Sequence, residues 1–280
     1  MSNPNLVGSG FRGAHPRRLI LVAALLLTPM TASQAQEHDD DHDHDHLHFS
    51  HPLVTESPSP DTKLRLDYIG FRTSDPSGIH ENIFRLEGEY AFTHSVSLAV
   101  VTPFISRTAP ATERASGLGN IELSLKAASL AFGEHGLLLG GGLSAALPTG
   151  SDVKGIGSSH LVELEPFLDV GYKRDALELV GITILSSTFR RRPGEERERN
   201  VTFDFSALYR IQPRLEGLIE MTTSRALIGP GSGIQQTFVA PGVKVYPFTN
   251  RKFMFGASFE IGTGVIHDTH ALLLSGFYHF

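Results

Sequence analysis

The sequence predicts an all-β protein, a single transmembrane antiparallel up-and-down β-barrel of about 12 strands with a disordered N-terminal arm. Three observations predict this fold. The first 35 residues have the pattern of a secretory signal. After them, apolar and polar residues alternate in many segments, as in strands with one apolar and one polar face. The links between these segments are alternately short and long, as in bacterial outer-membrane barrels.

Residues 1–35 form the predicted signal peptide. Arginines precede an apolar stretch, Leu19–Leu27, and Ser33–Ala35 places small residues at a cleavage site. The apolar stretch is shorter than the roughly 20 residues that a membrane-spanning helix needs. We therefore expect export from the cytoplasm and removal of this segment. A retained N-terminal anchor is the alternative.

Residues 36–62 are the predicted disordered arm. The stretch "EHDDDHDHDHLHFSH", Glu37–His51, holds six histidines and five aspartates, and "SPSP", Ser57–Pro60, has the composition of a stiff spacer. Glu37–Asp61 contains eight acids and no Lys or Arg, whereas the whole precursor carries a formal charge of −6. The excess of negative charge therefore lies in the arm and not in the segment predicted to fold. Such a polar, charged segment cannot build a core and should remain disordered without a ligand.

Residues 63–280 are the predicted outer-membrane barrel. In "NVTFDFSALYRI", for example, Val201, Phe203 and Phe205 oppose Thr202 and Asp204. Several alternating segments exceed the usual strand length of soluble sheets and reach the roughly 9–11 residues that a tilted membrane strand needs. The predicted strands lie near residues 63–71, 82–92, 95–105, 119–132, 136–148, 160–172, 176–188, 201–212, 214–226, 235–246, 251–263 and 270–280.

The links between the strands set the predicted orientation. "THS", "GEH", "KRDA", "QPR" and "PFTNR" are short, and they alternate with longer links such as "SRTAPATERASGLG" and "PTGSDVKGIGSS". An even strand number places both ends of the barrel on one side, with short turns in the periplasm and long loops outside. This predicts the outer membrane of a Gram-negative bacterium, with the N-terminal arm in the periplasm.

The last segment supports a membrane barrel over a soluble one. In "ALLLSGFYHF", apolar residues alternate up to the terminal Phe280, as in the strand that the outer-membrane assembly machinery recognises. A soluble β-sandwich would show the same alternation, but it would turn its apolar face inward. The loop lengths, the strand lengths and this ending favour the membrane barrel.

Three segments carry a family resemblance: "GLGNIELSLKA" from Gly117, "GGGLSAALPTGS" from Gly140 and "FVAPGVKVYP" from Phe238. Together they resemble the outer-membrane barrels labelled as the MetA pathway of phenol degradation family, which are transporter-like. The resemblance covers roughly Leu64–Phe280, and Asn120 stands where an aspartate is typical. It implies a barrel of this size that moves small, often hydrophobic, molecules. It implies no catalytic residues, and the histidine-rich arm is not part of it.

The polar faces give a list of lumen-lining residues. If the apolar faces meet lipid, the polar ones point inward. They form either ion pairs that fill a narrow barrel or a polar channel that prefers cations because carboxylates are in excess. The principal candidates are Arg85, Glu87, Glu89, Glu122, Lys126, Glu163, Glu165, Asp204, Arg210 and Glu260, with Lys63, Arg65, Asp67, Asp169, Glu216, Glu220, Lys244 and Lys252 on the same faces.

One predicted strand is apolar on both faces. Val180, Ile182 and Ile184 would point inward, opposite Leu179 and Leu185. Inward apolar residues suit an apolar ligand path or contact with a plug packed inside the barrel. A patchily apolar lumen without either role is the alternative.

The arm is a candidate metal-binding segment. Neutral imidazole binds Zn, Cu, Ni and Co, and carboxylates add oxygen ligands. Such a string suits labile binding of several ions, unlike a closed site with four ligands at fixed spacing. A solvated acidic tail without a metal role is the alternative. The candidate ligands are His38, His42, Asp43, His44, Asp45, His46, His48 and His51.

The predicted function is therefore a barrel that passes small solutes, hydrophobic molecules or divalent metals, with no required cofactor. A non-conducting receptor or metal buffer is the alternative. An outer-membrane lipid hydrolase is a weaker one, because Ser158, Ser159 and His160 lack a Gly-x-Ser-x-Gly elbow. The expected partners are membrane lipid, lipopolysaccharide and the assembly machinery. The basic loop Arg190–Arg199 could bind lipopolysaccharide phosphates, but a solvated loop with internal ion pairs is the favoured alternative. The body has no basic face for nucleic acid, and the absence of cysteine excludes disulfides and thiolate sites.

Overall fold

The computed structural model describes residues 47–73, 78–109, 112–132, 135–229, 231–264 and 268–280. Thirteen strands are present in these ranges: β1 Lys63–Thr73, β2 His80–Thr93, β3 Val96–Ala109, β4 Thr112–Leu118, β5 Ile121–Phe132, β6 Leu137–Leu147, β7 Val162–Arg174, β8 Leu177–Phe189, β9 Arg199–Gln212, β10 Leu215–Ile228, β11 Gln235–Val245, β12 Phe253–Thr263 and β13 Thr269–His279. No helix in this part of the chain is long and apolar enough to cross a membrane.

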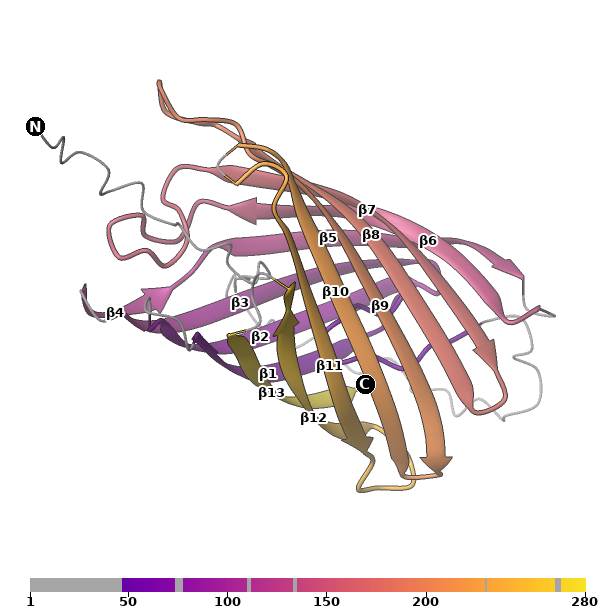
Figure 1. Ribbon diagram of the computed structural model, residues 1–280. Helices are drawn as coiled ribbons and strands as arrows, with labels where there is room; N and C mark the ends of the chain where they lie inside the picture. The colour runs from indigo at the N-terminus through magenta and orange to yellow at the C-terminus, as the bar shows by residue number, and fades with distance from the viewer. Residues whose placement is uncertain (1–46, 74–77, 110–111, 133–134, 230, 265–267) are drawn as a thin grey trace, which may run out of the picture.

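The strands form one closed antiparallel barrel (Figure 1). Apart from β4 and β5, strands that are neighbours in the chain pair with each other, and β1 pairs with β13 from Lys63↔His279 to Thr73↔Thr269, which closes the sheet. Strands β4 and β5 pair with successive parts of β3, so they share one position and the barrel has 12 positions. The predicted fold class is confirmed.

Strand β4 was not predicted. Its residues belong to the long link that follows Ile105 in the predicted arrangement, whereas β3 continues to Ala109 and pairs with β4 as a hairpin. In "TERASGL" the residues do not alternate between apolar and polar. A hairpin that extends beyond the apolar layer needs no apolar face, which explains the missing signal.

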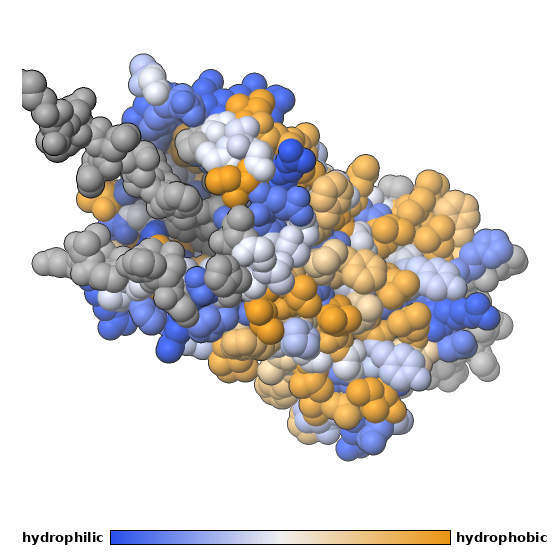
Figure 2. Space-filling model, viewed as in Figure 1, coloured by the Kyte–Doolittle hydropathy of each residue, from blue (hydrophilic) through white to orange (hydrophobic). Residues whose placement is uncertain are grey.

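The barrel turns its apolar side chains outward. Along β1 and β2, Leu66 is 57% exposed and Phe84 is 52% exposed, while Arg65, Asp67 and Arg85 are buried. A soluble barrel would do the reverse. Figure 2 shows apolar residues spread over the middle of the barrel wall, with hydrophilic residues at both of its ends. This pattern is that of a barrel that spans a membrane.

Aromatic side chains mark the end that carries the short turns. Phe253 contacts both Phe248 and Tyr278, with ring centroids 5.7 and 4.7 Å apart, and Tyr278 contacts Phe280 at 4.8 Å. Phe92, at the same end of β2, is 58% exposed. Aromatic girdles of this kind lie at the membrane–water interface of barrels. Lys63, the first residue of β1, and His279, the last residue of β13, also lie at the short-turn end.

A long loop folds back into the opposite mouth. Ile156, in the link between β6 and β7, is 1% exposed and packs against the inward-facing Ile83 and Ile105. Its backbone is held by reciprocal hydrogen bonds with Ser151. The loop 148–161 therefore narrows the lumen at the long-loop end.

Candidate functional site

Residues 47–62, here called the plug segment, lie inside the barrel. They form no strand, yet Phe49, Leu53 and Thr55 have no exposed surface and His51 is 2% exposed. For these residues the prediction of a disordered arm and a stiff spacer is wrong. The composition is polar, but the lumen supplies charged partners for the backbone and side chains, and this compensation is invisible in the arm's own sequence.

The plug segment fills the half of the lumen next to the short turns. Leu53 packs with Leu208, Met254 and Phe277, which lie near the short-turn ends of β9, β12 and β13. A side chain at Gly256 would overlap Leu53, because a Cβ atom there would lie 2.3 Å from its Cδ2. The missing side chain at this position therefore makes room for the plug segment.

A second apolar contact involves the strand that was predicted to be apolar on both faces. Val180 is 1% exposed and packs in one cluster with Phe49, Leu138 and Ala128. A Cβ atom at Gly171 would lie 2.6 Å from Cζ of Phe49, so glycine leaves space for this ring as well. Of the two roles considered for an inward apolar residue, Val180 has the contact with a packed plug.

Glu220 on β10 holds the bend of the plug segment. Its carboxylate accepts backbone hydrogen bonds from Leu53 at 3.2 Å, Val54 at 3.0 Å and Thr55 at 3.0 Å. It also accepts one from the hydroxyl of Ser206 at 2.8 Å. Hydrogen bonds to a carboxylate are stronger than those between neutral groups. A single lumen side chain therefore satisfies three successive buried amides.

Other charged lumen groups bind the plug backbone along its length. Lys244 donates to the carbonyl oxygen of His51 at 3.0 Å, and Lys173 donates to that of His48 at 2.8 Å. The amide of Ser50 donates to the carboxylate of Glu178 at 2.7 Å. The guanidinium of Arg65 donates to the carbonyl oxygen of Leu53. Both signs of lumen charge are used, because the backbone offers both donors and acceptors.

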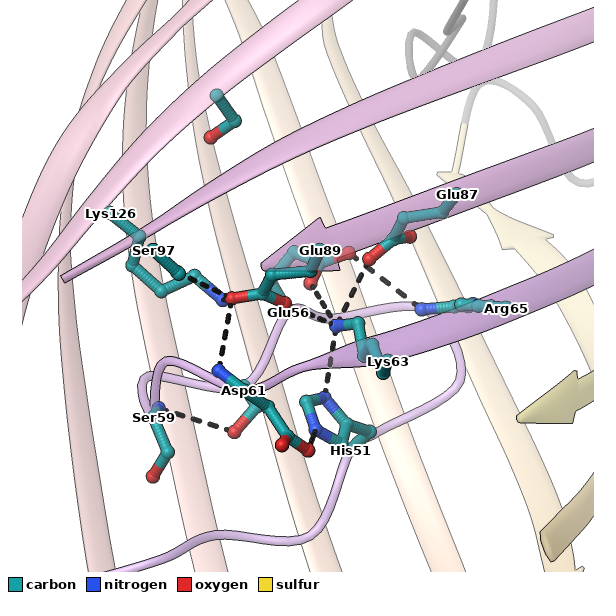
Figure 3. Close-up of polar contacts among 12 residues, drawn as sticks. His51, Glu56, Ser59, Asp61, Lys63, Arg65, Glu87, Glu89, Ser97 and Lys126 are labelled. Carbon is teal, nitrogen blue, oxygen red and sulfur yellow. Dashed lines mark hydrogen bonds and ion pairs between the residues drawn. The ribbon is translucent and has the colours of Figure 1, made fainter. Parts of the chain in front are cut away.

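Ion pairs connect the lumen strands to one another around the plug segment (Figure 3). The ammonium of Lys63 lies 3.0 Å from Glu87 and 2.8 Å from Glu89, and Lys126 lies 3.3 Å from Glu89. Asp67 lies 2.8 Å from Arg65 and 2.5 Å from Arg85. These groups are almost fully buried, so each charge requires a partner of opposite sign.

The predicted lumen residues differ in their burial. Arg85, Glu87, Glu89, Lys126 and Asp204 are buried. The other five principal candidates are half-buried: Glu122, Glu163, Glu165, Arg210 and Glu260. Lys252 was expected to face inward, but it precedes β12 and is exposed.

A histidine cluster lies at the short-turn mouth. Oδ2 of Asp61 lies 3.0 Å from Nε2 of His51, 2.6 Å from Nδ1 of His279 and 3.6 Å from Nε2 of His48. Burial lowers the pKa of His51 well below its ordinary value, and the nearby Lys63 ammonium adds to this effect. Burial alone would raise the pKa of Asp61, but the hydrogen bonds from His279, His48 and His51 lower it overall.

Only part of the predicted metal-binding string can be placed. His48 and His51 belong to the histidine cluster, and His38, His42, Asp43, His44, Asp45 and His46 lie outside the described residues. Sequence reasoning missed Asp61 and His279 as members of this cluster. The available signal was the apolar content of "LHFSHPLV", Leu47–Val54, which is unusual for a solvated arm.

A second charged cluster, here called the outer clasp, joins two long loops at the opposite mouth. His160 lies 2.9 Å from Asp152 through Nδ1 and 2.9 Å from Glu195 through Nε2. Hydrogen bonds to Glu195 and to Asp152 raise the pKa of His160. The backbone amide of Arg192 and then His160 lower the pKa of Glu195. Burial would raise the pKa of Asp152, but hydrogen bonds from Ser159 and His160 lower it overall.

The outer clasp bears on the hydrolase alternative. His160 was expected to begin a strand, but β7 begins at Val162, and the Ser158 hydroxyl lies 3.3 Å from Nδ1 of His160. Asp152 uses the same nitrogen, and Glu195 takes the other one. A serine–histidine–aspartate triad instead needs the serine and the acid on different ring nitrogens.

Comparisons with known proteins agree with the architecture. An outer membrane channel from Pseudomonas putida F1 is 14% identical over 87% of this chain and 100% of that one, with a TM-score of 0.61. A NanC porin is 10% identical over 77% of this chain and 100% of that one, with a TM-score of 0.52. The translocator domain of the autotransporter NalP from Neisseria meningitidis covers 78% and 88%, at 11% identity and a TM-score of 0.51.

The chain has the fold of an outer-membrane β-barrel. No family model matches the sequence, and no curated protein matches it. The resemblance to the phenol-degradation family therefore stays a prediction. At these identities the outer-membrane barrels share a fold with this chain, and the plug segment and the two charged clusters must be interpreted from its own residues.

Proposed function

We propose that this protein is an outer-membrane channel for small solutes and that the plug segment is its gate at the periplasmic mouth. The observation that carries the proposal is the position of residues 47–62 inside the lumen, directly ahead of β1. The contacts of the plug segment are mainly charge-assisted hydrogen bonds, which water can replace when the segment leaves. Their net contribution to docking is therefore small compared with their strength in isolation.

The apolar part of docking is also limited. Phe49 and Leu53 are the fully buried hydrophobic side chains of the plug segment. Burial of each such side chain contributes about 1.5–3 kcal/mol. Release costs this contribution but frees a flexible, polar chain and hydrates the lumen charges. A plug held in this way suits reversible opening.

The charge inside the lumen points to the class of solute. Among the described residues, nine acids and five bases are buried; the acids are Asp67, Glu81, Glu87, Glu89, Asp169, Glu178, Asp204, Glu216 and Glu220, and the bases are Lys63, Arg65, Arg85, Lys126 and Lys244. An excess of carboxylates favours cations in a water-filled passage. The open channel therefore prefers cationic solutes, with divalent metals as one class. Capture of divalent metal by the histidine-rich arm is the corresponding role for the arm.

A covalent lock tests the gate. The chain has no cysteine, and a Cβ atom at Gly256 would lie 3.2 Å from Cγ of Leu53. Because a cysteine Sγ occupies roughly the place of a leucine Cγ, this spacing leaves room for an S–S bond of about 2.05 Å, and the pair Leu53→Cys and Gly256→Cys suits a disulfide. In planar bilayers we expect the oxidised protein to be silent and the reduced protein to show intermittent, cation-selective conductance.

Two controls accompany the lock. Each single-cysteine variant should conduct like the unmodified protein under both redox conditions, and deletion of residues 47–62 should give steady conductance. Equal conductance of the oxidised and reduced pair would exclude the plug segment as a gate. Absence of conductance in every form would favour the second candidate, a non-conducting receptor or metal buffer, which the filled short-turn half of the lumen also supports.

A further inference from the structure

We infer that the inner mouth of the barrel holds a site for a divalent transition metal, formed by four side chains: His48, His51, Asp61 and His279. Three of them belong to the plug segment and the fourth to β13, so a bound metal ties the plug segment to the last strand of the barrel. The site itself stands on its geometry. Its effect on conductance rests on the proposed function.

The geometry of the cluster suits a small tetrahedral ion. Nitrogen atoms of three histidines point to one carboxylate oxygen of Asp61, at 3.0, 2.6 and 3.6 Å. In a tetrahedral zinc site with ligands at about 2.0–2.1 Å, neighbouring ligand atoms lie about 3.3 Å apart. The ligand atoms of His48, His51 and Asp61 all lie within 4.8 Å of one another. Small side-chain movements would therefore bring His48, His51 and Asp61 to one ion, and His279, which contacts the same oxygen of Asp61, is the fourth ligand in reach.

The surroundings hold the ligands in place. The second carboxylate oxygen of Asp61 accepts the amide of Thr62 at 2.7 Å, and the amide of Asp61 donates to Glu89. The ring of His51 stacks on that of Phe277, with centroids 5.9 Å apart. Such outer contacts orient ligands and strengthen metal binding.

An ion can reach this site from the periplasmic side. The side chain of His48 is 59% exposed, and those of His279 and Asp61 are 22% and 18% exposed, whereas that of His51 is 2% exposed. The cluster therefore has an open side and a closed side. The histidine-rich residues 37–46 precede the open side in the sequence and would raise the local concentration of metal there.

One group opposes metal binding. The ammonium of Lys63 lies 3.2 Å from Nδ1 of His51, so this nitrogen accepts a hydrogen bond and Nε2 carries the ring proton toward Asp61. A metal on Nε2 replaces that proton and requires Nδ1 to become the donor. Lys63 must then turn away, and Glu87 and Glu89 already offer it two carboxylate partners at 3.0 and 2.8 Å.

The functional consequence follows from linkage. A metal that binds the docked plug segment and not the released one shifts the docking equilibrium by a factor of about 100 when its concentration is 100 times the dissociation constant. Zinc should therefore lengthen the closed periods of the channel by up to this factor. The same metal would then bind to the histidine-rich arm and also close the gate.

The binding test uses the full mature chain in which His38, His42, His44 and His46 are replaced by Asn, so that the outer part of the arm no longer binds metal. We expect one equivalent of Co²⁺ to give the visible absorption of a tetrahedral complex, and Zn²⁺ to displace it. His279→Ala should weaken binding at least about 10-fold. The matched control, His270→Ala, removes a histidine from the other end of β13 and should leave binding unchanged.

Asp61→Asn is a second variant for the same test, because it keeps the size of the side chain. Absence of a tetrahedral spectrum, or equal binding by the His279→Ala and His270→Ala variants, would overturn the site. If the disulfide lock closes the channel but no metal binds, the inference fails and the proposed function stands. If the metal binds as expected but no form conducts, the site stands and the proposed function fails.

Discussion

At the scale of single residues, Glu220 shows how the lumen selects the docked plug segment. Its carboxylate accepts three successive backbone amides, which only a tightly bent chain can present together. Without the plug segment, the same carboxylate would require water or a cation. Glu220 therefore discriminates between the closed and open states by the partners it has in each.

We predict that Glu220→Gln weakens docking of the plug segment. Glutamine has the same size, but it loses the charge and turns an NH₂ group toward amide donors. Loss of hydrogen bonds to a charged group costs about 1.5–3 kcal/mol, which is roughly a 10- to 150-fold rise in the undocked population. Hydrogen exchange of the Leu53, Val54 and Thr55 amides should accelerate accordingly. Glu165→Gln, whose parent carboxylate binds Ser186, is the control and should leave this exchange unchanged.

For the contacts between the lumen and the plug segment, the sequence predicted the lumen residue but not its partner. Strict alternation identified Glu220 and Lys244 as inward-facing, and both are buried. Their partners are backbone atoms of the plug segment, which carry no side-chain signal. His51 was expected to be a solvated ligand for the same reason, because nothing in "LHFSHPLV" states that a complementary interior exists.

At the scale of elements, the outer clasp links the loop 148–161 to the loop that follows β8. His160 lies between Asp152 and Glu195, one acid on each loop. Arg192 adds a contact to Asp152 at 3.7 Å. The loop 148–161 also inserts Ile156 into the lumen, so the clasp helps to hold that loop in the long-loop mouth.

We predict that the outer clasp loosens as the pH rises. The pKa of His160 is raised above its ordinary value of 6.5, so the contribution of His160 is complete below 6.5 and is lost as the pH passes the raised pKa. The pKa values of Asp152 and Glu195 are lowered from 3.8 and 4.5, so both acids remain charged well into the acid range. The clasp is therefore strongest between about pH 4.5 and 6.5.

Spin labels at Val153→Cys and Glu196→Cys would measure this change as a distance distribution between the two loops. We expect a narrow distribution at pH 6 and a broader one at pH 8.5. His160→Gln should give the broad distribution at both values. A narrow distribution at pH 8.5 in the labelled protein that retains His160 would contradict the expected pH dependence.

The elements themselves were largely predictable. Most predicted strands match the observed ones within two or three residues at each end, because a strand between lipid and a polar lumen must alternate throughout the apolar layer. The exception, β4, lies in a hairpin outside the apolar layer, where a strand need not alternate. The start of β7 at Val162 rather than residue 160 is a smaller difference of the same kind, since His160 belongs to the outer clasp.

At the scale of the whole molecule, the barrel has two chemically different mouths. Short turns, an aromatic girdle and the plug segment occupy one mouth, and long loops with the outer clasp occupy the other. The known pattern of outer-membrane barrels places the short turns in the periplasm. We predict the same orientation here, which would place the histidine cluster where periplasmic metal can reach it.

Cysteine labelling in intact cells tests this orientation. Val153, in the loop 148–161, is 99% exposed, and the side chain of Arg174, at a short turn, is 77% exposed. A membrane-impermeant maleimide should label Val153→Cys in intact cells and label Arg174→Cys only after the outer membrane is permeabilised. Labelling of Arg174→Cys alone in intact cells would mean that the barrel has the opposite orientation.

The closure of the barrel by β1 and β13 has a consequence for biogenesis. The binding partners of the plug segment, such as Glu220, Lys244 and His279, lie far along the chain, and the segment directly precedes the strand that completes the wall. Docking of the plug segment and pairing of β1 with β13 both join distant parts of the chain, and such contacts are slow to form. If the wall closes first, the newly inserted barrel is vacant until the plug segment docks. The speed of N-terminal docking would then set how long each new barrel leaks.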